Sequence, residues 1–298
     1  MRRWFRDLLF LMATFTAIVT GAFAQNSTCT LRMAFTSDVF GNVPLKDAEI
    51  AVQYWVELLA KDMGNTEYGW SRVFPDASSL FTAAGEQTFD ILAMPPVEYL
   101  QQQERELYEP VLASTLMGNC MTRFLLLVHR DSTITELRQL RGKTLILQSY
   151  GCGRAHEMWL DLQLKTAGEP RVREFFRRLT VEKEASKCAL PVFFRQADAC
   201  LMLNGSFDVL SEMNPQLKKQ LVTLKQSEEF LGGFVLFPKQ MPPARKQQLR
   251  DICLRMSTYP RGRQVFTLFR IESLISFPPG ALESLRSLLL RHMAEFKP

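Results

Sequence analysis

The sequence predicts an α/β fold of two lobes with a cleft between them. Apolar strands alternate with amphipathic helices from Leu31 to Met94, a pattern typical of a parallel, doubly wound sheet. A second alternation begins at Thr122. Ligands of such sheets bind outside the carboxyl ends of the strands. Two series with ligand-capable turns at their strand ends therefore indicate two lobes that enclose a ligand.

The first 24 residues are expected to be a secretory signal peptide, cleaved after Ala24. They combine a basic start (Arg2 to Arg6), an apolar run (Leu8 to Val19) and the small-residue ending Ala22-Phe23-Ala24. The apolar run is shorter than the ~20 residues of a membrane-spanning helix, which favours cleavage over a retained anchor. The mature chain, 25–298, has room for two lobes of roughly 100 to 150 residues each.

Charge excludes one class of function. Removing Arg2, Arg3, Arg6 and Asp7 changes 36 basic and 31 acidic residues to 33 and 30, so the net charge falls from +5 to +3. A nucleic-acid binder normally has a clustered basic face, and this balance argues against nucleic acid as a partner.

The first alternating series has three strands and two helices. We expect strands at 31–36, 68–74 and 89–94, and helices at 47–61 and 76–85. Gly64 ends the first of these helices, and Asp76 caps the second. The third strand ends at Pro95-Pro96.

The second series and the chain's end follow the same logic. Strands are expected at 122–128, 144–147, 179–181, 198–203 and 221–225, and helices at 153–166, 172–178, 185–196, 243–256, 262–269 and 280–295. The strand 144–147 runs through a glycine-rich turn into the helix at 153. Unpaired backbone N–H groups and the helix dipole point at such a turn, so we expect an anion to bind there.

Several segments resemble the PhnD-like group of type II periplasmic solute-binding proteins, which serve phosphate, phosphite and phosphonate uptake. The resemblance covers nearly the whole mature chain. The segments that resemble the family are LRMAFTSD, GEQTFDILAMPPVEYL, LLLVHRDSTITELRQLRGKTLIL, QADACLML and SEMNPQLKKQLVTLKQS. The third of these is the most specific, because a strand, "RDS", a short helix and "LRGKT" occur in order.

The resemblance implies the two-lobe periplasmic-binding-protein type II fold. Lobe 1 would comprise 25–116 plus 224–298, lobe 2 would comprise 117–223, and crossover strands would fall near 112–116 and 221–226. It further implies a monomer in the periplasm that holds a small oxyanion in the interlobe cleft for an ABC permease. No cofactor and no metal are implied.

The resemblance also implies where the ligand binds. Family members hold their oxyanion at a Ser-x-Ser-Gly turn, and the matching positions here are Tyr150, Gly151, Cys152 and Gly153. Only the second glycine fits, since Tyr150 and Cys152 replace the serines. Arg154 could fork onto an oxyanion, or it could be an ordinary surface arginine.

Lobe 1 contacts are expected after two strands. The resemblance places Thr36, Ser37 and Asp38 at the ligand, and Met94 and Tyr99 could line the same cleft. Asp38 would repel an anion unless it takes up a proton or pairs with a donor.

All six cysteines lie in the mature part, and an exported chain enters an oxidising compartment, so disulfides are expected. If the lobe 2 topology is as the family implies, Cys120, Cys152 and Cys188 surround the cleft. Three thiols there would suit trivalent arsenic, and the family includes arsenic-oxyanion-sensing members that work with sensor histidine kinases. A Cys152–Cys188 or Cys120–Cys152 disulfide is the alternative. The remaining cysteines, Cys29, Cys200 and Cys253, are expected to be structural.

An enzyme is not expected. Cys152 and His156 lie four residues apart on one helix face and could in principle make a nucleophile pair. No acid completes a triad, so no catalytic residue is assigned.

Overall fold

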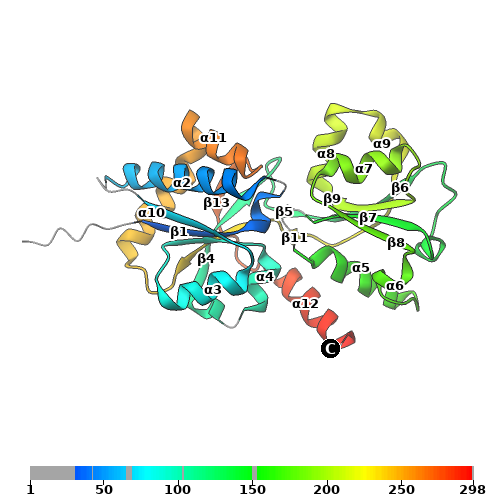
Figure 1. Cartoon of the computed structure of the whole chain (residues 1–298), viewed down its shortest axis with the longest axis horizontal. Helices are drawn as coiled ribbons and strands as arrows, with labels where there is room; N and C mark the ends of the chain where they lie inside the picture. Colours follow the sequence, from blue (N-terminus) through cyan, green and yellow to red (C-terminus); the bar gives the residue numbers. More distant parts are fainter. Residues whose placement is uncertain (1–30, 42, 65–68, 103, 150–152, 297–298) are drawn as a thin grey trace, which may run out of the picture.

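Two lobes lie side by side in the computed structural model, which describes residues 31–41, 43–64, 69–102, 104–149 and 153–296 (Figure 1). The expected signal peptide lies outside these residues, as do Cys29, Tyr150, Gly151 and Cys152. No helix within the described ranges has the length and apolar character to cross a membrane.

Lobe 1 is built on a six-stranded sheet with the order β13-β4-β12-β3-β1-β2. Its strands are β1 (Arg32–Thr36), β2 (Trp70–Phe74), β3 (Ile91–Ala93), β4 (Tyr108–Thr115), β12 (Phe234–Pro238) and β13 (Ser273–Ser276). The expected parallel series is present, because β1 pairs in parallel with both β2 and β3. The other half is antiparallel: β12 pairs with β3 and β4, and β13 with β4. The sequence did not predict β12 or β13, and the crossover strand expected near 112–116 overlaps the end of β4.

Helices cover both faces of this sheet (Figure 1). They are α2 (Leu45–Asp62), α3 (Ala77–Glu86), α4 (Pro96–Gln101), α10 (Pro243–Arg255) and α11 (Pro260–Leu268). The predicted cap of α3 is confirmed, since the Asp76 side chain accepts a hydrogen bond of 2.7 Å from Ser79 N. Short 3₁₀ helices complete the chain: η1 (Ser37–Phe40), η2 (Glu104–Leu107), η3 (Leu137–Leu140) and η4 (Met256–Thr258).

Lobe 2 has a five-stranded sheet with the order β10-β6-β9-β7-β8. Its strands are β6 (Phe124–His129), β7 (Thr144–Gln148), β8 (Arg178–Glu182), β9 (Ala199–Leu203) and β10 (Leu221–Gln226). One face carries α5 (Ala155–Thr166) and α6 (Val172–Phe175), and the other α7 (Ala185–Phe193), α8 (Asn204–Met213) and α9 (Gln216–Gln220) (Figure 1).

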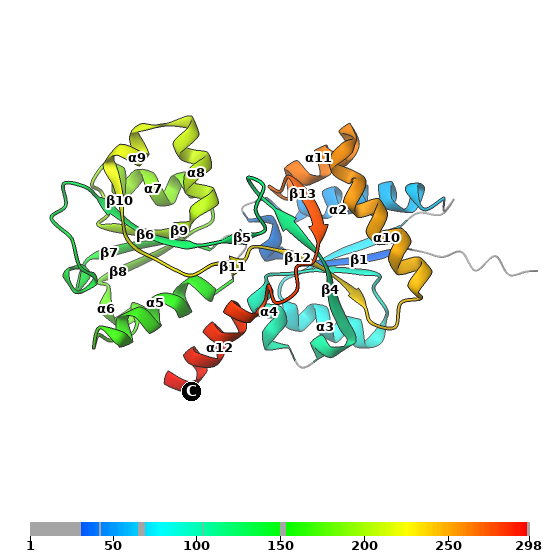
Figure 2. The ribbon, with the colours of Figure 1, turned by 180° about the vertical axis from the view of Figure 1, so that it is seen from behind.

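The two connections between the lobes meet as a short ribbon. β5 (Met121–Thr122) pairs antiparallel with β11 (Phe230–Leu231), and this pair lies between the two sheets (Figure 2). The expected second crossover, 221–226, is corrected: it forms β10 and pairs along β6, so it belongs to the lobe 2 sheet. The crossing comes after it, beginning at Ser227, whose hydroxyl accepts from Phe124 N at 2.8 Å.

The C-terminal helix α12 (Glu283–Glu295) contacts both lobes (Figure 2). It was expected within lobe 1, yet it packs on α5 of lobe 2 as well as on α4 of lobe 1. His292 Nε2 lies 2.9 Å from Asp161 Oδ2 of α5, and both side chains are buried. α12 is therefore a further link between the lobes, beside the two crossovers.

Candidate ligand-binding site

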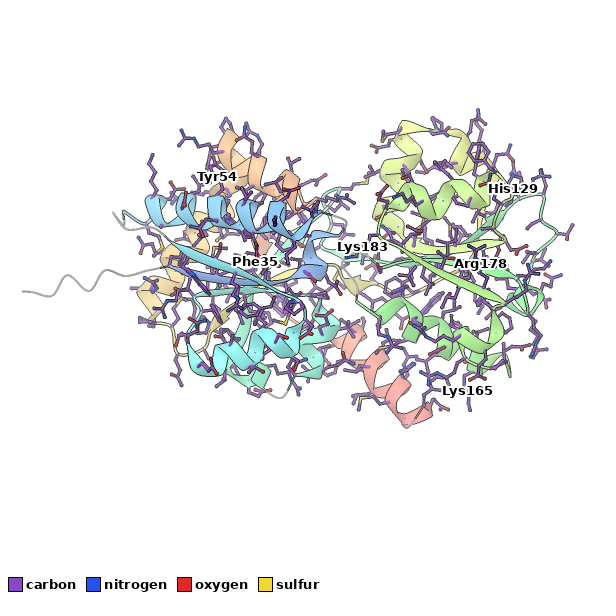
Figure 3. The ribbon with its side chains drawn as sticks, in the orientation of Figure 1. Phe35, Tyr54, His129, Lys165, Arg178 and Lys183 are labelled. Atoms are coloured by element: carbon purple, nitrogen blue, oxygen red, sulfur yellow. The ribbon has the colours of Figure 1, made fainter. Side chains whose placement is uncertain are left out.

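A cavity of about 390 Å³ lies between the lobes. Its lining comes from the ends of β1 and β3, the two crossovers, the start of α8 and the segment after α11. Figure 3 shows why lobe 2 contributes strand ends: Lys183, just after β8, lies toward lobe 1, whereas Arg178 at the start of β8 lies on the far side. The carboxyl ends of the parallel strands of lobe 2 thus point at the cleft, as expected for a ligand site in an α/β sheet.

Part of the lobe 1 wall of the cavity is apolar, beside the polar side chains of Ser114, Thr115 and Arg270. Phe35, Trp55 and Phe269 line it and pack on one another, with ring centroids 5.5 Å apart for Phe35–Trp55 and 4.9 Å for Trp55–Phe269. Val39 of η1 and Met94, next to the end of β3, extend the same wall. These side chains form part of the lobe 1 core or pack against it, so the wall is an edge of that core.

The lobe 2 wall is polar and is formed by the start of α8. The side-chain oxygen Oδ1 of Asn204 accepts hydrogen bonds from Thr122 Oγ1 at 2.8 Å and from Arg123 N at 2.9 Å, which ties α8 to the first crossover. Ser206 Oγ accepts from Gln148 Nε2 at 3.0 Å. The backbone N–H of Asn204 donates to Arg123 O at 2.9 Å, whereas no side chain in the described chain caps α8. Gly205 and Ser206 of its first turn line the cavity, where the helix dipole favours an anion.

Two charged side chains line the cavity in its described part. Asp208 pairs with Lys218 at 3.0 Å, which offsets its charge. The other is Arg270, an exposed side chain that supplies the positive charge of the lining. Its φ of 52° is unfavourable for a residue with a Cβ, and residues held in this way concentrate at ligand sites.

Gly153, at the start of α5, lies directly against lobe 1. A Cβ added there would come 2.9 Å from Val97 Cγ1, 3.5 Å from Glu98 Oε1 and 3.7 Å from Pro95 Cβ. Its φ of +52° also favours glycine. Because Pro95 lines the cavity as well, this contact between the lobes closes one edge of it.

A pair of carboxyl groups lies beside this contact. Burial, together with the negative charges of Asp38 and Asp76, raises the pKa of Glu98 to about 8. Glu98 is therefore mostly protonated at neutral pH and shares a hydrogen bond with Asp38. Its Oε2 atom is buried and makes no hydrogen bond within the described structure. Asp38, expected at the ligand, does not line the cavity, and the hydrogen bond with protonated Glu98 partly offsets its negative charge.

Comparison with known families decides what this two-lobe architecture is. Residues 46–278 match the family described as "ABC transporter, phosphonate, periplasmic substrate-binding protein". The chain belongs to this family. It is thus a periplasmic solute-binding protein of the phosphonate type, which partners an ABC transporter and is not an enzyme. A search of curated protein sequences found no match.

Solved structures share the fold. XAC2383 from Xanthomonas citri bound to ATP has a TM-score of 0.65 at 21% identity, covering 90% of this chain and 99% of that one. A binding protein component of an ABC phosphonate transporter from Pseudomonas aeruginosa has a TM-score of 0.62 at 15% identity, covering 89% and 86%. PhnD1 from Prochlorococcus marinus in complex with methylphosphonate has a TM-score of 0.61 at 9% identity, covering 88% and 97%. At these identities the likeness confirms the predicted fold alone.

The expected lobe 1 contacts fall in different places. Met94 lines the cavity. Thr36 is buried, and its hydroxyl makes no hydrogen bond to any described residue. Ser37 Oγ donates to Pro75 O at 3.0 Å. The Tyr99 hydroxyl lies 3.3 Å from Tyr108 O, to which it donates, and its ring packs on Phe234 in the core.

The expected lobe 2 contacts are also divided. Cys120 lines the cavity and is half-buried. Cys188 is a fully buried residue of α7, and burial raises the pKa of its thiol to about 12. Arg154 Nη2 lies 3.6 Å from Glu157 Oε1, which is also bound by Arg173, and Arg154 does not line the cavity.

The thiols do not form a described cluster. All four described cysteines are free, and of these only Cys120 lines the cavity. A disulfide or thiol ligand involving Cys152 lies outside the described residues. His156 is buried against Phe124, and burial lowers its pKa to about 4, so it is neutral.

Sequence reasoning missed Asn204, Ser206, Glu98 and Arg270. The first two could have been found, since Asn-Gly-Ser directly follows the strand predicted to end at Leu203. Arg270 gives no local signal, because only the packing of α11 on lobe 1 brings it to the cleft.

Proposed function

We propose that this protein captures a small oxyanion of the phosphate, phosphite or phosphonate type in the interlobe cavity and delivers it to an ABC permease. The proposal rests on one observation: groups that attract an anion lie on both sides of one cavity. Arg270 brings a full positive charge from lobe 1, and the uncapped start of α8 brings backbone N–H groups from lobe 2. Helix N-termini and arginine are the two devices that most often hold oxyanions.

Binding would be coupled to a hinge motion. A ligand that touches Arg270 and the start of α8 at once stabilises the closed arrangement, because only that arrangement satisfies both contacts. The ribbon of β5 and β11 provides the hinge, and the Gly153–Val97 contact limits how closely the lobes approach. The turn of Tyr150, Gly151, Cys152 and Gly153 remains a proposed further contact, because Gly153 adjoins the cavity through Pro95.

A second candidate is an arsenic oxyanion, with the protein acting as ligand input to a sensor histidine kinase. One observation favours it: the Cys120 thiol lines the cavity and is free. The full burial of Cys188 counts against a site made of three thiols.

Calorimetric titration of residues 25–298 tests both candidates. The protein is first unfolded and refolded to release any bound ligand, then titrated with phosphate, phosphite, methylphosphonate, arsenite and arsenate. The proposal predicts binding of at least one phosphorus oxyanion. Preferential binding of arsenite, lost in Cys120→Ser, would support the second candidate, and no binding of any oxyanion would contradict both.

A matched pair of arginine variants tests the site. Arg270→Gln removes a charge-assisted hydrogen bond worth about 1.5–3 kcal/mol, which corresponds to roughly ten- to a hundredfold in Kd. Arg261→Gln, on the exposed surface of α11, removes the same charge outside the cavity and should leave Kd unchanged.

A further inference from the structure

The cavity is large for a bare oxyanion. A tetrahedral oxyanion of five heavy atoms displaces roughly two to three water molecules, each of about 30 Å³. The cavity measures about 390 Å³. An inorganic anion held at Arg270 and α8 would leave most of this space filled with water.

The lining of the cavity is mixed in character. Apolar side chains of lobe 1 form one part of it: Val39 is half-buried, whereas Phe35, Trp55, Met94 and Phe269 belong to the core and are at most 7% exposed. Polar side chains form another part, namely Ser114, Thr115 and Arg270 of lobe 1 and Asn204, Ser206 and Thr122 across the cleft. A ligand in the cavity therefore meets polar groups over one part of the lining and hydrocarbon over another.

Trp55 is the largest side chain of this apolar wall, and its N–H group is used within the core. The indole N–H of Trp55 is directed at Met256 Sδ, 3.1 Å away on the side of the core. Trp55 is also fixed between Phe35 and Phe269. Water against such a surface finds few hydrogen-bond partners, whereas an apolar group that displaces it removes hydrocarbon surface from water. A rigid wall of this kind favours a ligand part that is itself apolar.

We infer that the ligand is an organic oxyanion with a bulky apolar substituent, of aryl or branched-alkyl size, which packs on Val39 and on the edge of the lobe 1 core formed by Trp55, Met94 and Phe269. The inference rests on the proposed function, since it requires that the anionic group is held in this cavity. It makes the lobe 1 wall the determinant of specificity among phosphonates. The lobe 2 wall and Arg270 contribute affinity for the anionic group, which all phosphonates share.

Two ligands of equal charge separate the apolar contribution from the anionic one. Methylphosphonate and phenylphosphonate carry the same head group and differ in apolar surface. Calorimetric titration of residues 25–298 should give a Kd for phenylphosphonate at least tenfold lower than for methylphosphonate. Equal affinities, or tighter binding of methylphosphonate, would overturn the inference and leave the proposed function standing. If neither compound nor phosphate binds, the proposed function itself fails.

A matched pair of substitutions tests the wall. Val39→Thr places a hydroxyl at the apolar wall with little change in shape, and Val39 is only half-buried, so the fold should tolerate it. We expect phenylphosphonate binding to weaken roughly five- to tenfold, because the hydroxyl loses water without gaining a partner. Methylphosphonate binding should change less than twofold.

Val43→Thr is the control. Val43 is also half-buried and packs on the same lobe 1 core, but it does not line the cavity. It should leave the affinity for both phosphonates unchanged. An equal loss in the two variants, or a Val39→Thr effect shared by both ligands, would contradict packing of the substituent on this wall.

Discussion

His292 of the last helix lies 2.9 Å from Asp161 of α5, and the pair is buried between elements that start in different lobes. Asp161 also accepts a hydrogen bond of 2.8 Å from Val172 N, so its carboxylate anchors α12, α5 and α6 at once. Because α12 leaves lobe 1 and packs on lobe 2, this pair restrains how the lobes can move.

Replacing His292 should measurably destabilise the protein. His292→Leu leaves Asp161 Oδ2 with only the longer, 3.4 Å contact to Arg171 Nε, and the loss of the buried partner costs about 1–3 kcal/mol in the free energy of unfolding. Urea unfolding followed by circular dichroism measures this. Glu295→Gln is the control, because it breaks the exposed Lys165–Glu295 pair between the same two helices at a cost of about 0–1 kcal/mol. Equal effects would show that the buried pair has no special role.

A methyl group at Gly153 should weaken ligand binding. Gly153→Ala adds a Cβ 2.9 Å from Val97 Cγ1 in the other lobe, so the closed arrangement becomes less favourable. Gly142→Ala is the matched control, since Gly142 also has a positive φ but has open space around its Cβ position. Both variants should lose about 1–2 kcal/mol of stability from backbone strain. Only Gly153→Ala should raise the Kd for the phosphonate that binds most tightly. Equal Kd values in the two variants would show that the Gly153–Val97 contact does not form when the lobes close.

Glu98 should make stability fall as pH rises. Its pKa is raised from 4.5 to about 8 by burial and neighbouring carboxylates. The folded protein therefore binds more protons than the unfolded chain between these values, and the free energy of unfolding decreases across this window. Glu98→Gln should remove that decrease. The stability of the variant, measured relative to the unsubstituted protein, should therefore be higher at pH 9 than at pH 5. Urea unfolding at pH 5, 7 and 9 measures it, with the exposed Glu86→Gln as control. If the free energy of unfolding of Glu98→Gln falls with pH as steeply as that of the unsubstituted protein, Glu98 is not protonated and buried in the folded state.

Ligand should protect Cys120 from alkylation. Cys120 is half-buried and lines the cavity, whereas burial raises the pKa of both Cys188 and Cys253 to about 12. Thiolate is the reacting form, so these two should react slowly in the native state. Mass spectrometry of each cysteine-containing peptide, with and without phosphonate, measures the rates. Rapid labelling of Cys188, or a Cys120 rate that ligand does not change, would contradict the geometry.

The sequence predicted those parts of the fold that local patterns encode. The parallel strands from β1 to β3, the Asp76 cap and the helix α5 follow from hydrophobic periodicity and turn chemistry. β12 and β13 were missed because their pairing partners lie far away in the chain, and only the end of β4 was expected, as a crossover strand implied by the resemblance. The resemblance implied that α12 belongs to lobe 1, whereas its packing on α5 depends on tertiary contacts.

The site was predictable to a smaller degree, for the same physical reason. Met94 directly follows β3 and Cys120 directly precedes β5, and both residues line the cavity. Tyr99 also follows a strand, but its hydroxyl donates to backbone carbonyls in the core, which no local pattern indicates. Arg270 reaches the cavity only through the packing of the C-terminal part on lobe 1.

The position of the phosphorus atom in a crystal structure of residues 25–298 with methylphosphonate tests the central claim most directly. We predict that it lies in the interlobe cavity, with phosphonate oxygens bound by the Arg270 guanidinium on one side and by the N–H groups of Gly205 and Ser206 on the other. A phosphonate bound outside this cavity, or held by one lobe alone, would contradict the account.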